Sequence, residues 1–240
     1  MVNSNNELAY TALPASEIII SKTSRLWSAY ALVIFSCLLL YIQMLAPYFL
    51  PAHFGAFTLQ KTTHFIYFIA FNLFWCVAIP ITANKLVLKD NLAFLRMPKN
   101  KMTAILLTCL ALLLLVPFMY YFSKQADFRT YYYLGHNSVA KIVLIDFLLM
   151  PLYYFSEEFF FRGYLFLGLW RRVGWHSFWI TDIIFTIAHM NKPGLEILLA
   201  IPASVIFNLL TLKTKSIYPA VIVHTTMGIV LNLAVMFAHS

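Results

Sequence analysis

The chain has 240 residues, of which 62% are hydrophobic and only 11% are charged. Average globular domains carry about 25% charged residues, so the composition excludes an ordinary soluble domain and indicates a membrane protein. No soluble segment exists in which basic residues alternate with aromatic ones. The formal net charge of +8 is therefore interpreted as membrane topology and attraction to anionic lipid. We expect the lipid bilayer as a partner, and neither a nucleic acid nor a cofactor.

Apolar runs long enough for a membrane-crossing helix, about 20 residues, recur along the chain. They cover 26–48, 64–83, 102–122, 139–170, 175–190, 194–212 and 216–238. The fourth run would be about 48 Å long as one helix, so a break or kink near Pro151, or an interfacial end, is expected. The sequence therefore predicts an all-α, polytopic membrane helical bundle with seven or eight transmembrane helices. It forms one structural domain overall, with a polar segment at 1–25, amino-terminal helices within 26–138 and a second group within 139–240.

The basic residues indicate the orientation of these helices. If the amino terminus is cytoplasmic and the runs alternate, one set of basic residues falls on the cytoplasmic side: Lys22, Arg25, Lys85, Lys89, Arg96, Lys99, Lys101, Arg171, Arg172, Lys213 and Lys215. A smaller set falls outside: Lys61, Lys124, Arg129, Lys141 and Lys192. This asymmetry follows the positive-inside rule. We expect an integral multi-pass protein of a bacterial inner (plasma) membrane, with a cytoplasmic amino terminus and an uncleaved first helix.

Two adjacent carboxylates and an arginine interrupt the fourth apolar run. Positions four apart share a helical face, so Glu158 and Arg162 are predicted to pair. Glu157 lies about 100° round the helix from Glu158 and is expected to keep a free carboxylate. An unpaired carboxylate in an apolar bundle is a stronger base than one in water and suits general-base chemistry. The alternative is a purely structural salt-bridge network.

Two histidines lie in later apolar runs. His189 shares a helical stripe with Phe185 and Asp182, and it either holds a water molecule with Glu157 or lies at the interface. His224 is about 10 Å beyond the basic boundary at Lys215. An ionisable side chain at that depth needs a partner or a function.

The order of these residues resembles the signature of the CPBP family, the CAAX protease and bacteriocin-processing (ABI) membrane proteins. Glu157-Glu158-x-x-x-Arg162-Gly resembles its EExxxR motif, Phe185-x-x-x-His189 looks like its FxxxH motif, and His224 stands where its last motif begins. The similarity covers about 150–232, so 139–240 would form the catalytic core. The resemblance implies an intramembrane glutamic endopeptidase that cleaves a membrane-associated peptide or protein.

The resemblance also implies roles for individual residues. Glu157 and His189 would activate water, and His224 would steady the oxyanion. Glu158, Arg162 and Phe185 would support them. We expect no metal ion at this site.

One position departs from the family pattern, because Gly228 stands where the family usually has asparagine. Asn208 or Thr225 is expected to supply the missing oxyanion donor. Two alternatives stay open: a metal-dependent membrane protease that binds a metal through Glu157, His189 and His224, and a non-catalytic scaffold or immunity protein of the same fold. A transporter ranks last, since no inverted repeat is evident.

Overall fold

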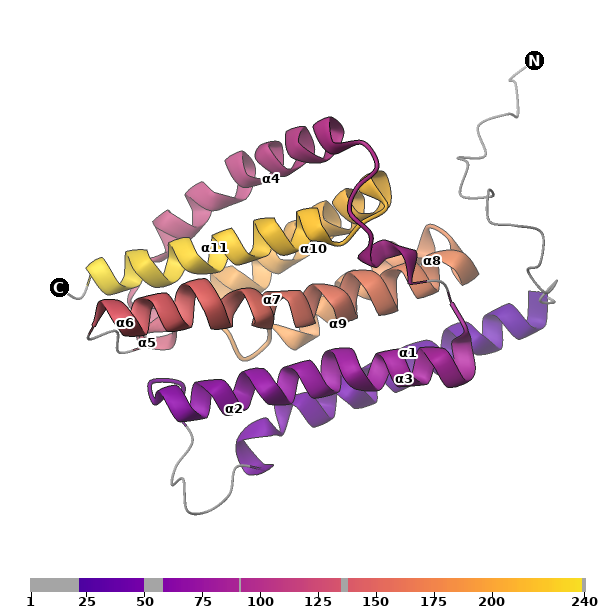
Figure 1. Ribbon diagram of the computed structural model, residues 1–240, viewed down its shortest axis with the longest axis horizontal. Helices are drawn as coiled ribbons and strands as arrows, with labels where there is room; N and C mark the ends of the chain where they lie inside the picture. The colour runs from indigo at the N-terminus through magenta and orange to yellow at the C-terminus, as the bar shows by residue number, and fades with distance from the viewer. Residues whose placement is uncertain (1–21, 50–57, 91, 135–137, 239–240) are drawn as a thin grey trace.

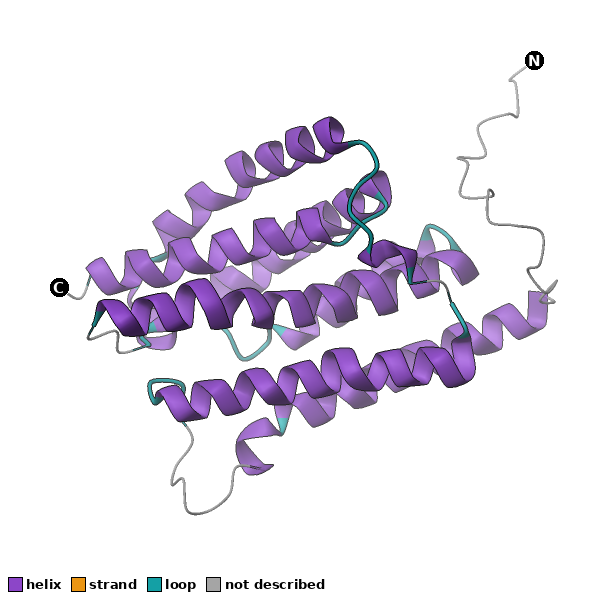
Figure 2. Ribbon diagram, viewed as in Figure 1, coloured by secondary structure: helices purple, strands orange, loops and turns teal. Residues whose placement is uncertain are grey.

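The computed structural model describes residues 22–49, 58–90, 92–134 and 138–238, so most of the polar segment 1–25 lies outside the described residues. Within the described ranges the regular structure is entirely helical, as Figure 2 shows. This confirms the predicted all-α class.

Figure 1 shows the helices in their order along the chain. Their bounds are α1 Lys22–Met44, α2 Thr62–Leu73, α3 Ile79–Ala83, α4 Lys101–Phe122, α5 Ala126–Tyr132, α6 Val139–Ile142, α7 Met150–Glu158, α8 Leu167–Val173, α9 His176–Ala188, α10 Gly194–Thr214 and α11 Tyr218–Phe237. π-helical segments join α2 to α3 and α6 to α7 to α8, so 62–88 and 139–173 each run as one continuous helix.

Six of the described helices are long and apolar enough to cross a membrane: Ser24–Met44, Thr62–Leu88, Lys101–Phe122, Val139–Val173, Gly194–Thr214 and Tyr218–Phe237. The chain is thus a polytopic helical bundle and an integral multi-pass membrane protein. The prediction of seven or eight differs from these six candidate spans for two separate reasons.

The first reason is α9. The run 175–190 forms a helix of only 13 residues, about 20 Å long against a hydrocarbon core of about 30 Å. It packs beside α10 as a hairpin, in which Asp182 accepts hydrogen bonds from Ser204 and Asn208. By length alone, α9 is therefore shorter than the candidate spans.

The second reason is the fourth run, which does not break near Pro151. It forms one helix of 35 residues. Pro151 lies in the first turn of α7, directly after the π-helical segment Val143–Leu149. Because the regular hydrogen-bond ladder is already interrupted there, the missing N–H of proline breaks no further bond.

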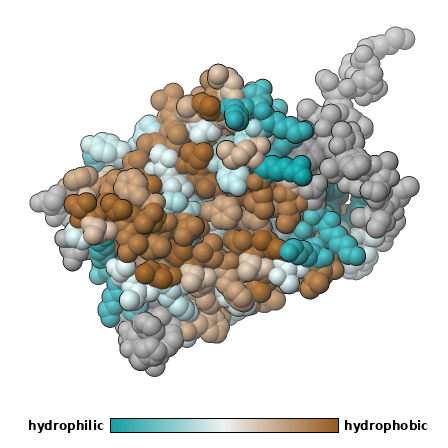
Figure 3. Space-filling view, in the orientation of Figure 1, coloured by the Kyte–Doolittle hydropathy of each residue, from teal (hydrophilic) through white to brown (hydrophobic). Residues whose placement is uncertain are grey.

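The long helix 139–173 lies between two groups of helices (Figure 1). On one side, buried residues of α1 such as Leu32 pack with its segment Phe159–Phe166. On the other side, α4, α10 and α11 pack together through a cluster that includes Phe207 and Leu231. Apolar side chains also cover much of the face shown in Figure 3, as lipid contact requires. This arrangement places Glu157, Glu158 and Arg162 in the middle of the bundle.

Candidate active site

The Glu158–Arg162 pair is the structural centre of the site. Arg162 Nε donates to Glu158 Oε2 at 3.0 Å, and both side chains are fully buried. The geometry of the predicted pair is therefore confirmed. A guanidinium buried this deeply needs further acceptors, because isolated charges are expensive to remove from water.

Those acceptors come from α10. Arg162 Nη1 donates to Ser204 Oγ and to Asn208 Oδ1, both at 2.9 Å. Asp182 Oδ1 on α9 accepts from Ser204 Oγ at 2.6 Å and from Asn208 Nδ2 at 3.0 Å. The guanidinium also lies 4.6 Å from the centre of the Phe185 ring, a favourable cation–π distance. One buried network thus ties the long helix to α9 and α10.

His224 stands between the two glutamates. Its Nδ1 lies 2.7 Å from Glu158 Oε1, and its Nε2 lies 3.8 Å from Glu157 Oε2. The Glu158 carboxylate, paired with Arg162, only accepts hydrogen bonds, so His224 Nδ1 carries the proton. In a neutral ring, Nε2 then carries the lone pair.

Glu157 points away from Arg162, as predicted. Tyr153 Oη donates to its Oε1 at 2.5 Å. Its Oε2 is buried and has no hydrogen-bond partner among the described residues. An unpaired buried carboxylate oxygen is costly, and in this position it is directed toward the His224 ring.

His189 is held at the carboxyl end of α9. Its Nδ1 lies 2.8 Å from the Phe185 carbonyl oxygen, and only 5% of the residue is exposed. Because a carbonyl oxygen only accepts, Nδ1 carries the proton and the neutral ring presents a lone pair at Nε2. The Phe185 ring packs on the imidazole at a centroid distance of 4.3 Å.

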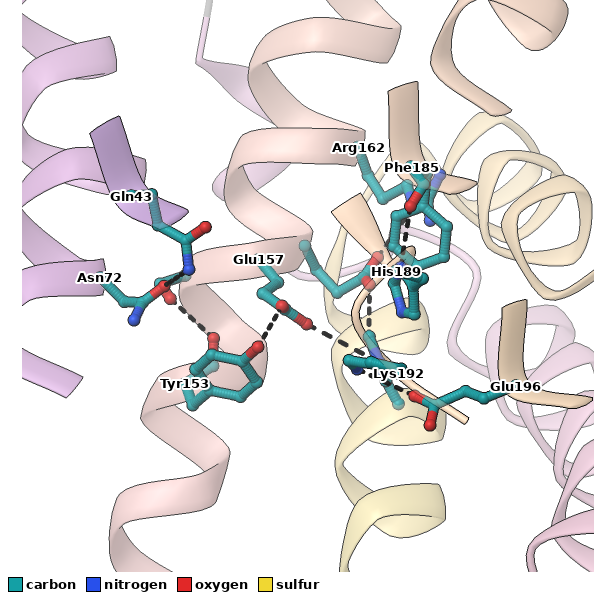
Figure 4. A network of polar contacts seen from close by, with 12 residues as sticks. Gln43, Asn72, Tyr153, Glu157, Arg162, Phe185, His189, Lys192 and Glu196 are labelled. Carbon is teal, nitrogen blue, oxygen red and sulfur yellow. Dashed lines mark hydrogen bonds and ion pairs between the residues drawn. The ribbon is translucent and has the colours of Figure 1, made fainter. Parts of the chain in front are cut away.

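A pocket brings the two histidines together. Its polar groups come from His189, His224, Tyr132, Tyr154, Lys192 and Glu196. Its apolar wall is formed by Met119, Leu199, Phe207, Met227 and Leu231. Glu157 lies beside His224 at the edge of this pocket and is not itself a lining residue, and Figure 4 shows its carboxylate directed toward the region of His189 and Lys192.

Sequence reasoning missed a second polar group in the pocket. Lys192 Nζ lies 2.9 Å from Glu196 Oε1, and Tyr132 Oη donates to the same carboxylate at 2.6 Å and 2.5 Å. Burial alone would lower the pKa of Lys192, but the Glu196 and Glu157 carboxylates outweigh it and raise that pKa above its ordinary value. The only signal in the sequence was the i, i+4 spacing of Lys192 and Glu196, which is also typical of a solvated helix face.

The two residues expected as oxyanion donors have different surroundings. Asn208 is fully buried, its amide is engaged at both ends by Arg162 and Asp182, and it does not line the pocket. Thr225 does not line the pocket either, although its Oγ1 is buried without a partner among the described residues. The engaged amide argues against Asn208 as a donor, and the role of Thr225 stays a prediction.

Gly228, by contrast, does line the pocket, and its missing side chain has a structural reason. A β-carbon built there would lie 2.1 Å from Tyr154 Oη and 2.4 Å from two ring atoms of the same tyrosine. Real β-carbons do not come that close to another heavy atom. Tyr154 thus fills the space that a side chain at 228 would take.

The metal-binding alternative requires Glu157, His189 and His224 to converge on one ion. Among the residues that the structure describes, no group of three or more His, Cys, Asp or Glu side chains is arranged to hold a metal. We derive no chemical step through a metal.

Residues 137–230 match the family model described as type II CAAX prenyl endopeptidase, Rce1-like. The match covers less than half of the 240 residues but contains all three motifs. No curated protein and no solved structure matches the chain. The matched segment is a domain of this family of peptide hydrolases, which confirms the resemblance read from the motifs.

Proposed function

We propose that this chain, with its Rce1-like type II CAAX prenyl endopeptidase domain at 137–230, hydrolyses a peptide bond of a membrane-associated substrate by glutamate-activated water. The observation that carries the proposal is Glu157 Oε2. It is buried without a hydrogen-bond partner among the described residues, 3.8 Å from His224 Nε2. One water molecule at about 2.8 Å from each of these two atoms fits beside them.

Glu157 and His189 are the groups that activate this water. The Glu157 carboxylate takes a proton while the water oxygen attacks the peptide carbonyl carbon, and the carbonyl π electrons move to its oxygen. His189 Nε2, with a lone pair while Nδ1 is bound to Phe185 O, accepts the second hydrogen of the water and orients it. Removal of water from the bundle strengthens both interactions.

The tetrahedral intermediate collapses when the amide nitrogen is protonated. Protonated Glu157, or His189 after it has gained a proton, returns the proton to nitrogen, the C–N bond breaks, and an acid and an amine leave. This reuse of one group as base and then acid is ordinary in hydrolases.

His224 is proposed to steady the oxyanion in its protonated form. Since Nδ1 is engaged by Glu158, a neutral ring has no proton at Nε2 to donate. Glu158, which is itself held by Arg162, fixes the ring. Phe185 supports the site by packing against both His189 and Arg162.

The site lies among membrane helices, so the substrate is proposed to be a membrane-anchored peptide or protein. His189, directly after α9, and Lys192, in the α9–α10 loop, both line the pocket among these helices. A cytoplasmic amino terminus in a bacterial plasma membrane remains the proposed orientation, supported by the distribution of lysine and arginine.

The test is cleavage of a library of membrane-anchored peptides by the detergent-purified full chain, run beside Glu157→Gln and with a chelator. Gln keeps the size of the side chain and removes the base. We expect cleavage by the parent protein, its loss in Glu157→Gln, and no effect of chelation. Loss on chelation would favour the metalloenzyme. Cleavage unchanged by Glu157→Gln, or none by the parent across the library, would contradict the proposal and favour the scaffold.

A further inference from the structure

Tyr154 forms the part of the pocket wall that lies next to His224. Its ring centre is 4.3 Å from that of the imidazole, and only 6% of the residue is exposed. Its hydroxyl reaches α11 at Gly228, four residues after His224 and therefore on the same helical face. The hydroxyl and the His224 ring thus border the same small volume.

The hydroxyl of Tyr154 differs from those of the other tyrosines around the site. Tyr153 Oη is bound to Glu157, and Tyr132 Oη is bound to Glu196. Tyr154 Oη has no hydrogen-bond partner among the described residues, although it lines the pocket. A buried tyrosine hydroxyl normally finds a partner, so this proton is available to a bound molecule.

A count of donors in the pocket favours the same residue. The Nδ1 protons of His189 and His224 are engaged by Phe185 O and Glu158. Lys192 is a donor, but Glu196 holds it by an ion pair at 2.9 Å. Beside the Nε2 proton proposed above for His224, Tyr154 Oη offers a second proton that no protein acceptor holds among the described residues.

We infer that Tyr154 is a catalytic residue whose hydroxyl donates a hydrogen bond to the scissile carbonyl oxygen as that oxygen becomes an oxyanion. The inference rests on the proposed function. No proton is transferred: the O–H bond of Tyr154 stays intact, and the hydrogen bond strengthens as negative charge develops. The absence of a side chain at Gly228 lets the hydroxyl reach this position.

A competing explanation is that Tyr154 only packs against the His224 ring. The two explanations differ in what the oxygen atom does, so Tyr154→Phe separates them: it keeps the ring and removes the donor. Tyr164→Phe is the matched control, because Tyr164 lies on the same continuous helix, is also 6% exposed, and does not line the pocket.

The measurement is steady-state cleavage of one peptide identified with the parent protein. We expect Tyr154→Phe to lower kcat about 100-fold or more, as the loss of one oxyanion donor does elsewhere, with KM and thermal unfolding unchanged. Tyr164→Phe should keep the parental kcat. A Tyr154→Phe protein with parental kcat, or with a change in KM alone, would overturn the inference.

Two further outcomes separate this inference from the proposed function. If Tyr154→Phe keeps its kcat while Lys192→Met loses it, Lys192 is the donor and the inference fails, but the proposed protease stands. If the parent protein shows no cleavage that depends on Glu157, the proposed function fails and the inference with it.

Discussion

Tyr154 and Gly228 share one space in the bundle: a β-carbon on Gly228 would overlap the phenol of Tyr154, with 2.1 Å to its hydroxyl oxygen. The two residues lie on α7 and α11 and are 74 positions apart in the sequence. The absence of a side chain at Gly228 on α11 therefore leaves the space that the Tyr154 hydroxyl of α7 occupies. This relationship makes the glycine a requirement of the pocket.

Gly228→Ala should therefore destabilise the protein. The new methyl group meets ring atoms of a buried side chain, and overpacking of this kind costs about 1–3 kcal/mol. The free energy of unfolding in detergent, followed by circular dichroism with denaturant, measures the effect.

The control for this prediction is the same substitution in a Tyr154→Ala protein, where the space is empty. There Gly228→Ala should cost little, so the two changes should be strongly non-additive. Equal costs in both backgrounds would mean that the overlap with Tyr154 is not the cause.

Arg162→Met should be among the most destabilising substitutions in the chain. It leaves the fully buried Glu158 carboxylate without its cation, and breaking a buried pair in this way costs about 3–5 kcal/mol. Arg162→Lys should not restore stability, because an ammonium group cannot reach Glu158, Ser204 and Asn208 with the geometry of the guanidinium fork. Thermal unfolding of the purified proteins measures both.

Arg171→Ala is the matched control, since Arg171 also pairs with a carboxylate, that of Asp90 at 3.4 Å, but its side chain is 22% exposed. Its loss should cost no more than about 1 kcal/mol. If Arg162→Met is as mild as Arg171→Ala, the buried network does not stabilise the fold.

Tyr153→Phe should slow cleavage without unfolding the protein. Tyr153 is a positioning residue, whose hydroxyl donates to Glu157 Oε1 and directs Oε2 toward His224. A hydrogen bond to a charged group is worth about 1.5–3 kcal/mol, so kcat should fall about 10–100-fold with KM unchanged. Tyr164→Phe again serves as control, and a parental kcat in Tyr153→Phe would refute the role.

Much of the core of the site could be predicted from the sequence because its spacing is local. The i, i+4 rule gave the Glu158–Arg162 pair and the separate direction of Glu157. Motif order indicated that His189 and His224 belong with them. The helical class followed from the continuous apolar runs of about 20 residues, because these cross a bilayer as helices, whereas the strands of a membrane barrel are shorter and alternate apolar and polar residues.

The errors concern contacts between distant segments, which spacing does not encode. Asn208 looked available as a donor, but the tertiary fold brings it to Arg162 and Asp182. Gly228 looked like the loss of an oxyanion donor, although Tyr154 fills the space that a side chain at 228 would take. The count of spans differs because the apolar run 175–190 forms a helix of only 13 residues, His176–Ala188.

Glu196→Gln should destabilise the protein by about 1–3 kcal/mol, because it leaves the poorly hydrated Lys192 cation without its anion. The folded-state pKa of Lys192 is raised, so the stabilisation is fully present below the unfolded value of about 10.4 and is lost only as the pH rises through the folded value. The stability difference between parent and variant should therefore be constant from about pH 6 to pH 9. Denaturant unfolding in that range measures it, and in the double variant Lys192→Met/Glu196→Leu an apolar pair should recover part of the loss. A difference that disappears between these pH values would show that Lys192 is not the cation that Glu196 stabilises.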